Sequence, residues 1–479
     1  MKKRIFLVSL MILFILSMCI YISFFKSSNL TFLLAIPYDK NIPILVENIP
    51  VIKKGNLLVP ITATITRPVS ISVGNQQKKV KIDYLSKANL IPVDIIFQNE
   101  TVHYFLQTLP DTFPQYGIKN FSNQEGYVLI SLHGMNLVDP SYSFILDMDG
   151  NVIYYRGHPK VNQSMFHLQK VTLPNGKIRY ITHVQDGWGL DDSYIVGYHL
   201  IMDENFHELD RVKVLKTEKH DALLADEHDI LMLDDGHYIV IGQDIVETVL
   251  PDGKKSLITH SVIQEQKNGK VLLDWDSKEY PELQKACYEK CPEIHDYNAD
   301  YIHTNSLFVD PKDNNLLVSS ASSYSILKLD RQTGDILWVL GGKANQFQMP
   351  EEAEFIRQHD VQILSDGRFL MFDNHFSILF QAGMEHHKKF FANKKAQILI
   401  LALDERNKQI KSVENIPLNF WAPYMGSAQK LENGNWFVGC GSSDECTARM
   451  IDKSGNILWD MKANEPYKMF RAYYYGSLK

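Results

Sequence analysis

The chain has 479 residues, of which 45% are apolar, so it can bury a large core. This length suits one large repeat domain accompanied by a smaller domain. Lys and Arg number 49 against 56 Asp and Glu, which gives a formal net charge of −7. A net acidic chain without a run of Lys and Arg is a poor candidate for nucleic-acid binding, so we exclude that class of function.

Residues 1–27 are predicted to be a signal or membrane-anchor segment. Lys2, Lys3 and Arg4 precede an uncharged apolar run over residues 5–25, which at about 1.5 Å per residue matches a bilayer core of about 30 Å. The preceding positive charges predict that the N-terminus stays in the cytoplasm and that the rest is exported. No small-x-small cleavage site ends the run, which favours an uncleaved anchor over a removed signal peptide. The expected location is therefore the periplasmic or extracellular face of the cytoplasmic membrane.

The next segment, residues 28–125, contains short runs of β-forming residues that prolines interrupt. These runs are Leu57 to Arg67, Val69 to Val73, Val80 to Tyr84 and Ile91 to Phe97. Short strands bounded by such breakers predict a small β-sandwich-like domain.

Two hairpin patterns alternate over the rest of the chain, residues 126–479. The first, as in SFILDMDGNVIYY, begins six times, at Ser143, Tyr198, Ser261, Ser325, Ile398 and Ala448. The second, as in ILMLDDGHYIVIG, appears five times between these copies. Alternating hairpins predict antiparallel four-stranded units, and their repetition predicts a closed ring of blades. We therefore expect an all-β six-bladed propeller, whose missing second-type hairpin is completed by strands from the start of the domain.

Beyond Cys19 the sequence has four cysteines, Cys287, Cys291, Cys440 and Cys446. An even number of closely spaced cysteines in an exported chain is typical of disulfides. The simplest of the three connectivities pairs neighbours, Cys287 with Cys291 and Cys440 with Cys446. A four-cysteine zinc site is the alternative, and the lack of Cys-x-x-Cys spacing disfavours it.

Three copies of the second hairpin begin with histidine, namely His228, His303 and His359. Each of the three has an aspartate seven residues further on, in the turn (Asp235, Asp310 and Asp366). A shared offset predicts a shared place in the blade, so the three imidazoles should meet at the central channel if these strands are the inner ones. The turn aspartates are expected to be structural.

Asp229 and Asp360 directly follow two of these histidines. Successive side chains of a strand point to opposite faces, so these aspartates should bond to backbone or to a neighbouring blade rather than orient the histidine.

Converging neutral imidazoles suit two chemistries. They can bind a metal ion, or they can act as nucleophile, acid and base without one. A fourth histidine at the same register is missing, because the last hairpin has Gly426 there and His167 of the first is offset by one. The sequence also lacks a Gly-rich nucleotide-binding loop.

Several dispersed segments resemble the bacterial aryl-sulfate sulfotransferases, in the right order and hairpin context. They are EHDILMLDDGHYIVIG, DYIHTNSLFVDPKDNNLLVSS, ILKLDRQTGDILWVLGG, QHDVQILSDGRFLMFDN and GSAQKLENGNWFVGCG. The resemblance implies a periplasmic six-bladed propeller with an N-terminal β domain. It also implies transfer of a sulfuryl group from a phenolic sulfate ester to a phenolic acceptor, with neither a nucleotide sulfate donor nor a metal or other cofactor. Members of the family can be homodimers.

By this resemblance His359 is the nucleophile and carries the group as a sulfo-histidine. His228 and His303 would flank the sulfuryl group, bond its oxygens and handle the proton of the phenol. Thr304 and Asn305 belong to the same family segment and are expected to be further donors to the substrate.

The chain departs from the family at Ala321, where Ser-Ser-Ala replaces the usual Ser-Ser-Arg. Loss of one charged stabiliser can cost on the order of 10²–10³ in rate, and Tyr324, Arg357 or Lys343 could replace it. Two alternatives therefore stay open. One is a non-catalytic binding propeller, and the other is a metal-dependent propeller enzyme with the three histidines as ligands.

Overall fold

The computed structural model describes residues 30–39, 41–46, 49–54, 57–60, 69–80, 91–106, 109, 112–122, 124–134, 140–158, 163–188, 195–249, 253, 255–288, 298–376, 394–465 and 467–478. Two compact units divide between Phe113 and Pro114. The predicted anchor, residues 5–25, and Cys291 lie outside the described residues. No helix among the described residues has the length and apolar character needed to cross a membrane.

The N-terminal unit is one eight-stranded sheet in the order β1-β7-β8-β4-β3-β2-β5-β6. Its strands are β1 (Leu30–Leu33), β2 (Ile44–Val46), β3 (Ile49–Lys54), β4 (Leu57–Pro60), β5 (Val69–Val73), β6 (Gln76–Val80), β7 (Ile91–Ile96) and β8 (Thr101–Leu106). Side chains that alternate along these strands, including Phe32, Ile71, Val93 and Ile95, form one buried apolar core. The period-2 burial explains why the predicted runs Val69 to Val73 and Ile91 to Phe97 form strands here.

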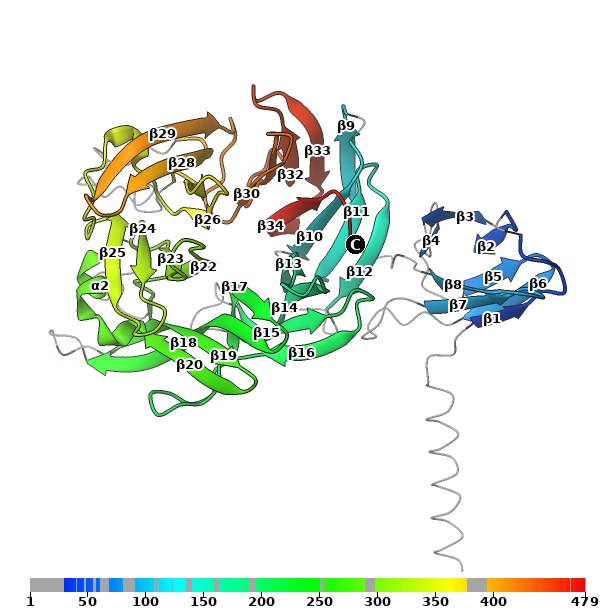
Figure 1. Cartoon of the computed structure of the whole chain (residues 1–479), viewed down its shortest axis with the longest axis horizontal. Coiled ribbons are helices and arrows are strands. Elements are labelled where there is room, and N and C mark those ends of the chain that lie inside the picture. The colour runs from blue at the N-terminus through cyan, green and yellow to red at the C-terminus, as the bar shows by residue number, and fades with distance from the viewer. Residues whose placement is uncertain are drawn as a thin grey trace, which may run out of the picture. The chain divides into compact units, whose positions relative to one another are not determined.

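The C-terminal unit consists of antiparallel sheets set around a common centre, a propeller-like arrangement (Figure 1). The first sheet, β12-β11-β10-β34, contains β10 (Tyr127–Gly134), β11 (Tyr142–Asp147), β12 (Val152–Gly157) and β34 (Tyr467–Tyr475). A nine-stranded sheet follows, with β13 (Met165–Thr172), β14 (Ile178–Trp188), β15 (Ile195–Met202), β16 (Glu208–Val212), β17 (Ala225–Asp234), β18 (His237–Val249), β19 (Lys255–Lys267), β20 (Lys270–Asp276) and β21 (Asn298–Ala299). Within it, β13–β16 and β17–β20 are two successive meanders that β15 and β17 join.

Three further sheets complete this unit. They comprise β22 (Thr304–Val309), β23 (Leu316–Ser320), β24 (Ser325–Leu329) and β25 (Ile336–Gly341), then β26 (His359–Ile363), β27 (Phe369–Asp373), β28 (Gln397–Asp404) and β29 (Gln409–Pro417), and finally β30 (Ser427–Lys430), β31 (Trp436–Gly439), β32 (Ala448–Ile451) and β33 (Ile457–Ala463). Helical segments are short: η1 (Ser277–Glu279), α2 (Pro281–Ala286) and η2 (Glu351–Ala353).

Both hairpin patterns read from the sequence form antiparallel pairs. The first type gives β11–β12, β15–β16, β19–β20, β24–β25, β28–β29 and β32–β33, and the second gives β13–β14, β17–β18, β22–β23, β26–β27 and β30–β31. The place of the missing second-type hairpin is taken by β10 and the C-terminal strand β34, which pair from Tyr127 with Tyr475 to Gly134 with Tyr467. The first and last parts of this unit are therefore hydrogen-bonded to each other.

A second pair ties the start of this unit to its end. β9 (Tyr116–Asn120) pairs antiparallel with β33, as the fifth strand of the last sheet. The sequence assigns these residues to the N-terminal domain, with a boundary at 125. The structure instead divides the chain after Phe113. β9 lies after this division because it pairs with β33, far along the chain, which its local sequence does not indicate. The predicted Cys440–Cys446 disulfide is present.

Candidate active site

The three predicted histidines lie at or next to irregularities in the strand pairing of the second-type hairpins. The register of β17 against β18 shifts across the segment that contains His228, and that of β26 against β27 shifts directly after His359. A third shift interrupts β22 and β23 directly after Thr304, next to His303. Such bulges re-aim side chains and are common at functional sites. His303 and Asp360 also adopt positive φ, 49° and 53°, so local backbone strain accompanies the bulges.

The structure brings together His228 of β17, His303 directly before β22, and His359 of β26. The His228 and His303 rings lie 4.8 Å apart between centroids and nearly perpendicular. Phe470, on β34, lies 5.3 Å from the His228 ring and 6.3 Å from the His359 ring. His167 also reaches this cluster despite its offset, with its ring 5.9 Å from that of Phe470.

The three imidazoles differ in what holds Nδ1. His228 Nδ1 lies 2.6 Å from Asp226 Oδ1, and His303 Nδ1 lies 2.8 Å from Asp300 Oδ2. His359 Nδ1 instead donates to neutral oxygens, the side-chain carbonyl of Asn374 at 2.7 Å and the backbone carbonyl of Arg357 at 2.8 Å. Two imidazoles are thus backed by carboxylates, and one is backed by neutral carbonyls.

This difference sets the charge of the rings. Burial lowers the pKa of His228, but the charges of Asp226 and Glu227 outweigh burial and raise it to about 9. Burial lowers the pKa of His359 well below its ordinary value, and the charges of Arg357, His228 and Arg471 act in the same direction. At neutral pH His228 is therefore an imidazolium and His359 a neutral imidazole.

The free electron pair of His359 is on Nε2, because Nδ1 carries the proton. Nε2 accepts a hydrogen bond from the backbone N–H of Met425 at 3.2 Å. Met425 has a φ of 66°, and the next residue, Gly426, has a φ of 119°. A Cβ at Gly426 would lie 2.5 Å from the Phe372 ring, so only glycine fits this turn beside the histidine.

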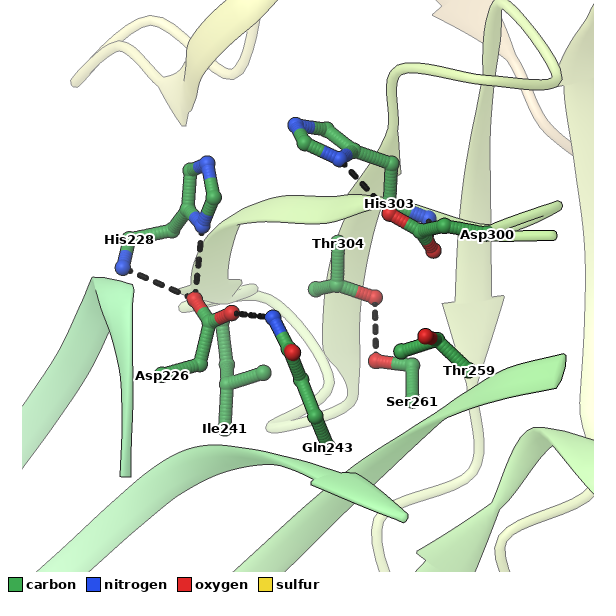
Figure 2. Close-up of a pocket in the computed structure, with 9 residues that line it drawn as sticks. All are labelled: Asp226, His228, Ile241, Gln243, Thr259, Ser261, Asp300, His303 and Thr304. Carbon is green, nitrogen blue, oxygen red and sulfur yellow. Dashed lines mark hydrogen bonds and ion pairs between the residues drawn. The ribbon is translucent and has the colours of Figure 1, made fainter. Parts of the chain in front are cut away.

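A small pocket opens beside two of the histidines (Figure 2). The residues that line it are Asp226, His228, Ile241, Gln243, Thr259, Ser261, Asp300, His303 and Thr304. Thr304, a predicted substrate ligand, lines it with its hydroxyl 2.7 Å from that of Ser261. Asn305, the other predicted ligand, donates from its side-chain amide to the Gln358 carbonyl at 2.7 Å and so links β22 to the His359 segment.

The two aspartates that follow histidines bond as predicted. Asp229 Oδ2 accepts from the backbone N–H of Leu307 in the next sheet at 2.9 Å. Asp360 Oδ2 accepts from the backbone N–H of Ala428, again in the next sheet, at 3.1 Å. The turn aspartates are structural, since Asp235, Asp310 and Asp366 bond to Arg179 (2.8 Å), Lys328 (2.6 Å) and Arg368 (3.0 Å) respectively.

Ala321 is buried beside His303, and its N–H donates to the His303 carbonyl at 3.0 Å. Of the three candidate replacements for the family arginine, Tyr324 stacks on Tyr288 with 4.9 Å between ring centroids. Lys343 Nζ donates to the Cys287 carbonyl at 2.6 Å. Arg357 lies two residues before His359 and is the candidate whose charge acts on that histidine.

Sequence reasoning missed several residues of this site. Asp226, Asp300 and Asn374, which hold the Nδ1 atoms, are among them. Arg471 of β34 is another, with 2% of its surface exposed at the centre of the sheets. The only sequence signal for Arg471 is a lone cation within the aromatic and apolar stretch MFRAYYY.

Two groups of described residues are close enough to hold a metal ion, Asp226 with Glu227 and His228, and Asp310 with Asp313 and Glu405. In the second group Lys328 Nζ occupies the centre, within 2.6 to 2.8 Å of all three carboxylates. In the first group, both carboxylate oxygens of Asp226 already accept hydrogen bonds, from His228 and Gln243. Existing donors thus occupy both oxygens of Asp226 in the first group and the centre of the second.

Comparison with known proteins places the chain in a family. No curated protein matches it. Solved structures to which the chain is similar include a protein of unknown function from Bacteroides caccae (12% identity, 73% of this chain and 99% of that one, TM-score 0.39) and the periplasmic gluconolactonase of Pseudomonas aeruginosa (12%, 73% and 99%, TM-score 0.36). Likeness at this level carries no functional information.

The sequence model of the arylsulfotransferase (ASST) family matches residues 116–463, which include all three histidines and β9 to β33. The match begins close to the structural division after Phe113. Transfer of a sulfuryl group between a phenolic sulfate donor and an acceptor is the activity associated with this family. The chain belongs to the arylsulfotransferase family.

Proposed function

We propose that the protein is an aryl-sulfate sulfotransferase that works through a sulfo-histidine on His359, with a phenolic sulfate ester as donor and a phenol as acceptor. It uses no nucleotide sulfate and no metal ion. The sheets β34/β10–β12, β13–β16, β17–β20, β22–β25, β26–β29 and β30–β33 then form the six blades of the propeller, with the active site on its axis. The family match and the shared register of the histidines support this proposal.

One observation carries the assignment of roles. His359 is held by neutral carbonyls, whereas His228 and His303 are held by carboxylates. A nucleophile must be neutral with a free electron pair, and an acid must be charged at the working pH. The three histidines therefore divide into one nucleophile, His359, and two rings backed by carboxylates, of which His228 carries the proton.

In the first step Nε2 of His359 attacks sulfur, and the bond between sulfur and the aryl oxygen breaks. The leaving phenolate takes the proton of the His228 imidazolium and departs as phenol. In the second step the acceptor phenol gives its proton to His228 as its oxygen attacks sulfur, and the nitrogen–sulfur bond breaks to restore His359. Because the two phenols bind in turn, the kinetics should be of the ping-pong type.

Sulfuryl transfer has a loose transition state, so donors around the equatorial oxygens stabilise it. His303 is another such donor beside His228, with its ring held by Asp300 through Nδ1. The Met425 N–H beside His359 Nε2 is a third donor at the point where sulfur bonds. Thr304 is a further donor in the same pocket.

We also propose that residues 5–25 anchor the protein in the cytoplasmic membrane with its catalytic unit on the periplasmic or extracellular side. Homodimers, which the family resemblance allows, can be tested by light scattering of the purified soluble part.

A direct assay tests the function. The full soluble part, from about residue 28, is given a chromogenic phenyl sulfate with and without a second phenol, and metal content is measured on the same sample. We expect phenol-stimulated release that His359→Ala abolishes, and a trapped adduct of one sulfuryl group on His359 by mass spectrometry. A second candidate function, a binding propeller without turnover, is favoured by the apolar Ala321 beside His303. Binding of phenyl sulfate without release of its phenol would support that alternative and overturn the proposal that the protein is a sulfotransferase.

A further inference from the structure

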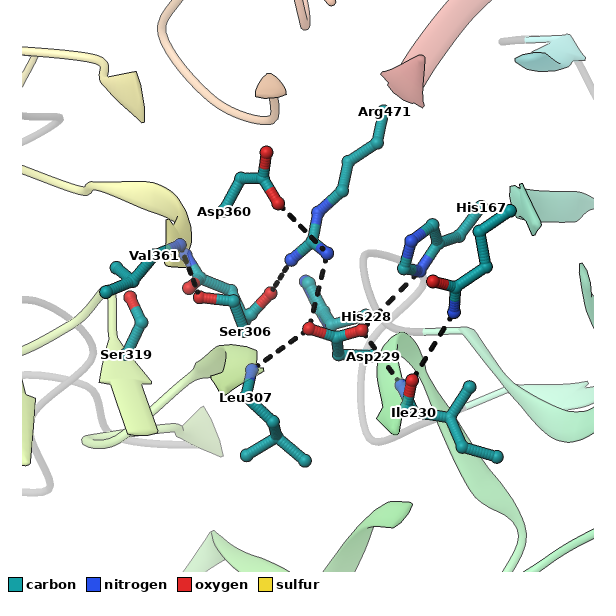
Figure 3. A network of polar contacts seen from close by, with 12 residues as sticks. His167, His228, Asp229, Ile230, Ser306, Leu307, Ser319, Asp360, Val361 and Arg471 are labelled. Carbon is teal, nitrogen blue, oxygen red and sulfur yellow. Dashed lines mark hydrogen bonds and ion pairs between the residues drawn. The ribbon is translucent and has the colours of Figure 1, made fainter. Parts of the chain in front are cut away.

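Arg471 lies at the centre of the C-terminal unit and contacts three strands from different sheets (Figure 3). Its Nη1 lies 3.2 Å from Asp229 Oδ2 and 3.6 Å from Asp360 Oδ1. Its Nη2 donates to the backbone carbonyl of Asn305 at 2.5 Å. Tyr473, on the same strand, donates from its hydroxyl to Asp360 Oδ1 at 3.0 Å.

The contacts of this guanidinium with β17, β22 and β26 fall within two residues of an active-site histidine. Asp229 directly follows His228, and Asp360 directly follows His359. Asn305 is two residues after His303. The Arg471 side chain is therefore bonded to β17, β22 and β26 close to the three residues that carry the imidazoles.

We propose that Arg471 is a positioning residue that sets the spacing of His228, His303 and His359, so that the C-terminal strand β34 completes the active site. Its effect on catalysis rests on the proposed function of these histidines. A planar guanidinium presents its donors from separate nitrogens in fixed directions, whereas the donors of a lysine ammonium share one nitrogen and rotate. Positioning matters because misplacement by about 1 Å can cost about 10²-fold in rate.

Arg471 acts through its neighbours rather than on the substrate. Its hydrogen bonds go to Asp229, Asn305 and Tyr473, and its guanidinium carbon lies 5.0 Å from the Phe470 ring. Asp229 and Asp360 in turn accept hydrogen bonds from backbone N–H groups of the following sheets. The cluster of Arg471, Asp229 and Asp360 therefore also links neighbouring sheets to one another.

Arg471 places one positive charge between two buried carboxylates, Asp229 and Asp360. Burial raises the pKa of both Asp229 and Asp360, and the charge of Arg471 opposes that rise. Removal of Arg471 alone would leave two buried carboxylates side by side, which is costly. A neutral variant, Asp229→Asn with Asp360→Asn and Arg471→Met, removes the whole charge cluster and gives a second way to test the geometry if single variants fold poorly.

Arg471→Lys and Arg471→Gln are compared with Arg179→Gln, in which another buried arginine loses its aspartate partner far from the histidines. Steady-state kinetics with phenyl sulfate and thermal unfolding are measured for each. We expect kcat to fall about 10²-fold in both Arg471 variants and in the neutral triple variant, with KM changed little, whereas Arg179→Gln loses stability alone. Wild-type kcat in folded Arg471→Lys or in the neutral variant would overturn the proposal.

A readout without turnover separates this proposal from the proposed function. The protein is labelled with ¹³C at the ring carbon of histidine, and the resonances of His228 and His359 are assigned with His228→Gln and His359→Gln. We expect Arg471→Lys to shift or split both resonances and Arg179→Gln to leave them unchanged. If the wild type shows no transfer at all, the proposed function fails, and the resonances still decide the role of Arg471. Unshifted resonances in Arg471→Lys would overturn it.

Discussion

Nδ1 of His228 lies 2.6 Å from Oδ1 of Asp226, two residues earlier on the same strand. The same oxygen also accepts the backbone N–H of His228 at 2.8 Å, so the aspartate fixes both the ring and its backbone. With Glu227 beside it, this carboxylate raises the pKa of His228, against the opposing effect of burial, to about 9. A phenol needs a proton from a group of similar acidity, so Asp226 tunes His228 for its role as acid.

Asp226→Asn tests this relationship with little change in shape. The new amide can still accept from His228, and the Gln243 side chain can turn to offer its oxygen, which has no hydrogen-bond partner among the described residues. The folded protein should therefore persist while the pKa of His228 falls. We expect kcat at neutral pH to fall about 10²-fold for donors with weakly acidic phenols and far less for donors with strongly acidic ones. An equal loss for all donors, measured across a series of substituted phenyl sulfates, would contradict the role of acid.

His228 also predicts how stability depends on pH. A group whose pKa rises on folding, here from 6.5 to about 9, contributes stability that is fully present below 6.5 and is lost as the pH rises through about 9. Glu227, whose pKa burial raises to about 8, adds a decline of the same sign from 4.5 upward. The free energy of unfolding should thus fall between pH 6.5 and 9 in the wild type, as measured by urea unfolding.

His228→Gln separates the two groups in that experiment. Its decline above pH 8 should be smaller than that of the wild type, while Glu227→Gln should retain the His228 decline but at lower pH, because the charge of Glu227 helps to raise the pKa of His228. Parallel curves for His228→Gln and the wild type across this range would show that the imidazolium is absent from the folded state.

Much of the fold could be predicted because the signals are local. Each first-type hairpin has a polar turn between two apolar strands, and every copy found in the sequence forms an antiparallel pair. The shared register of His228, His303 and His359 was legible for the same reason, since it depends only on position within a repeat. The sequence predicted that strands from the start of the domain complete the missing hairpin, and β10 is such a strand. Its partner, the C-terminal strand β34, and the pairing of β9 with β33 were not predicted, because these strands fall outside the repeat and pair with strands far along the chain.

The partners of the histidines could not be predicted, because they have no common spacing. The group on Nδ1 lies two residues before His228, three before His303 and fifteen after His359. Arg471 is 242 residues from Asp229, its ion-pair partner. Bulges and the meeting of distant strands decide these contacts, and neither leaves a periodic signal in the sequence.

Ala321→Arg restores the residue that the family pattern has beside His303. If a cation there stabilises the sulfuryl group, kcat with ordinary phenyl sulfates should rise by about 10²-fold or more. Ala321 is buried, with 1% of its surface exposed, so the larger side chain should also lower the free energy of unfolding by about 1–3 kcal/mol. Ala321→Leu is the matched control, because it adds bulk without charge and should lower stability alone. An equal kcat in the arginine variant and the wild type would show that other groups already stabilise the transferred group.

The Cys440–Cys446 disulfide closes a loop of six residues' separation at the end of β31. The loop-closure entropy of so short a loop predicts a loss of about 2 kcal/mol on replacement of both cysteines by alanine. The neighbouring Ser442 bonds to the backbone of Tyr424, next to Met425, so the loop supports the turn that donates to His359. We therefore expect kcat to fall as well, measured beside urea unfolding under non-reducing conditions. Unchanged kcat with reduced stability would show that the turn holds without the disulfide.

Asn374 contacts Nδ1 of His359, the proposed nucleophile, directly and is linked to its Nε2 through Met425. Its side-chain oxygen accepts from His359 Nδ1, and its amide donates at 2.8 Å to the carbonyl of Met425, whose N–H contacts His359 Nε2. Asn374→Asp would place a carboxylate behind His359, which favours the imidazolium and raises the pKa of that ring. Activity should then be lost at neutral pH and recover as the pH rises, because Nε2 is free only in the unprotonated form. Asn374→Ala removes the same amide without adding charge, so it should lower kcat and should not move the acid limb of the profile to higher pH, because the lost hydrogen bond is one that raises the pKa of His359. If the acid limb of the pH profile has the same midpoint in Asn374→Asp and the wild type, protonation of His359 does not limit the reaction, and another group must attack the sulfur.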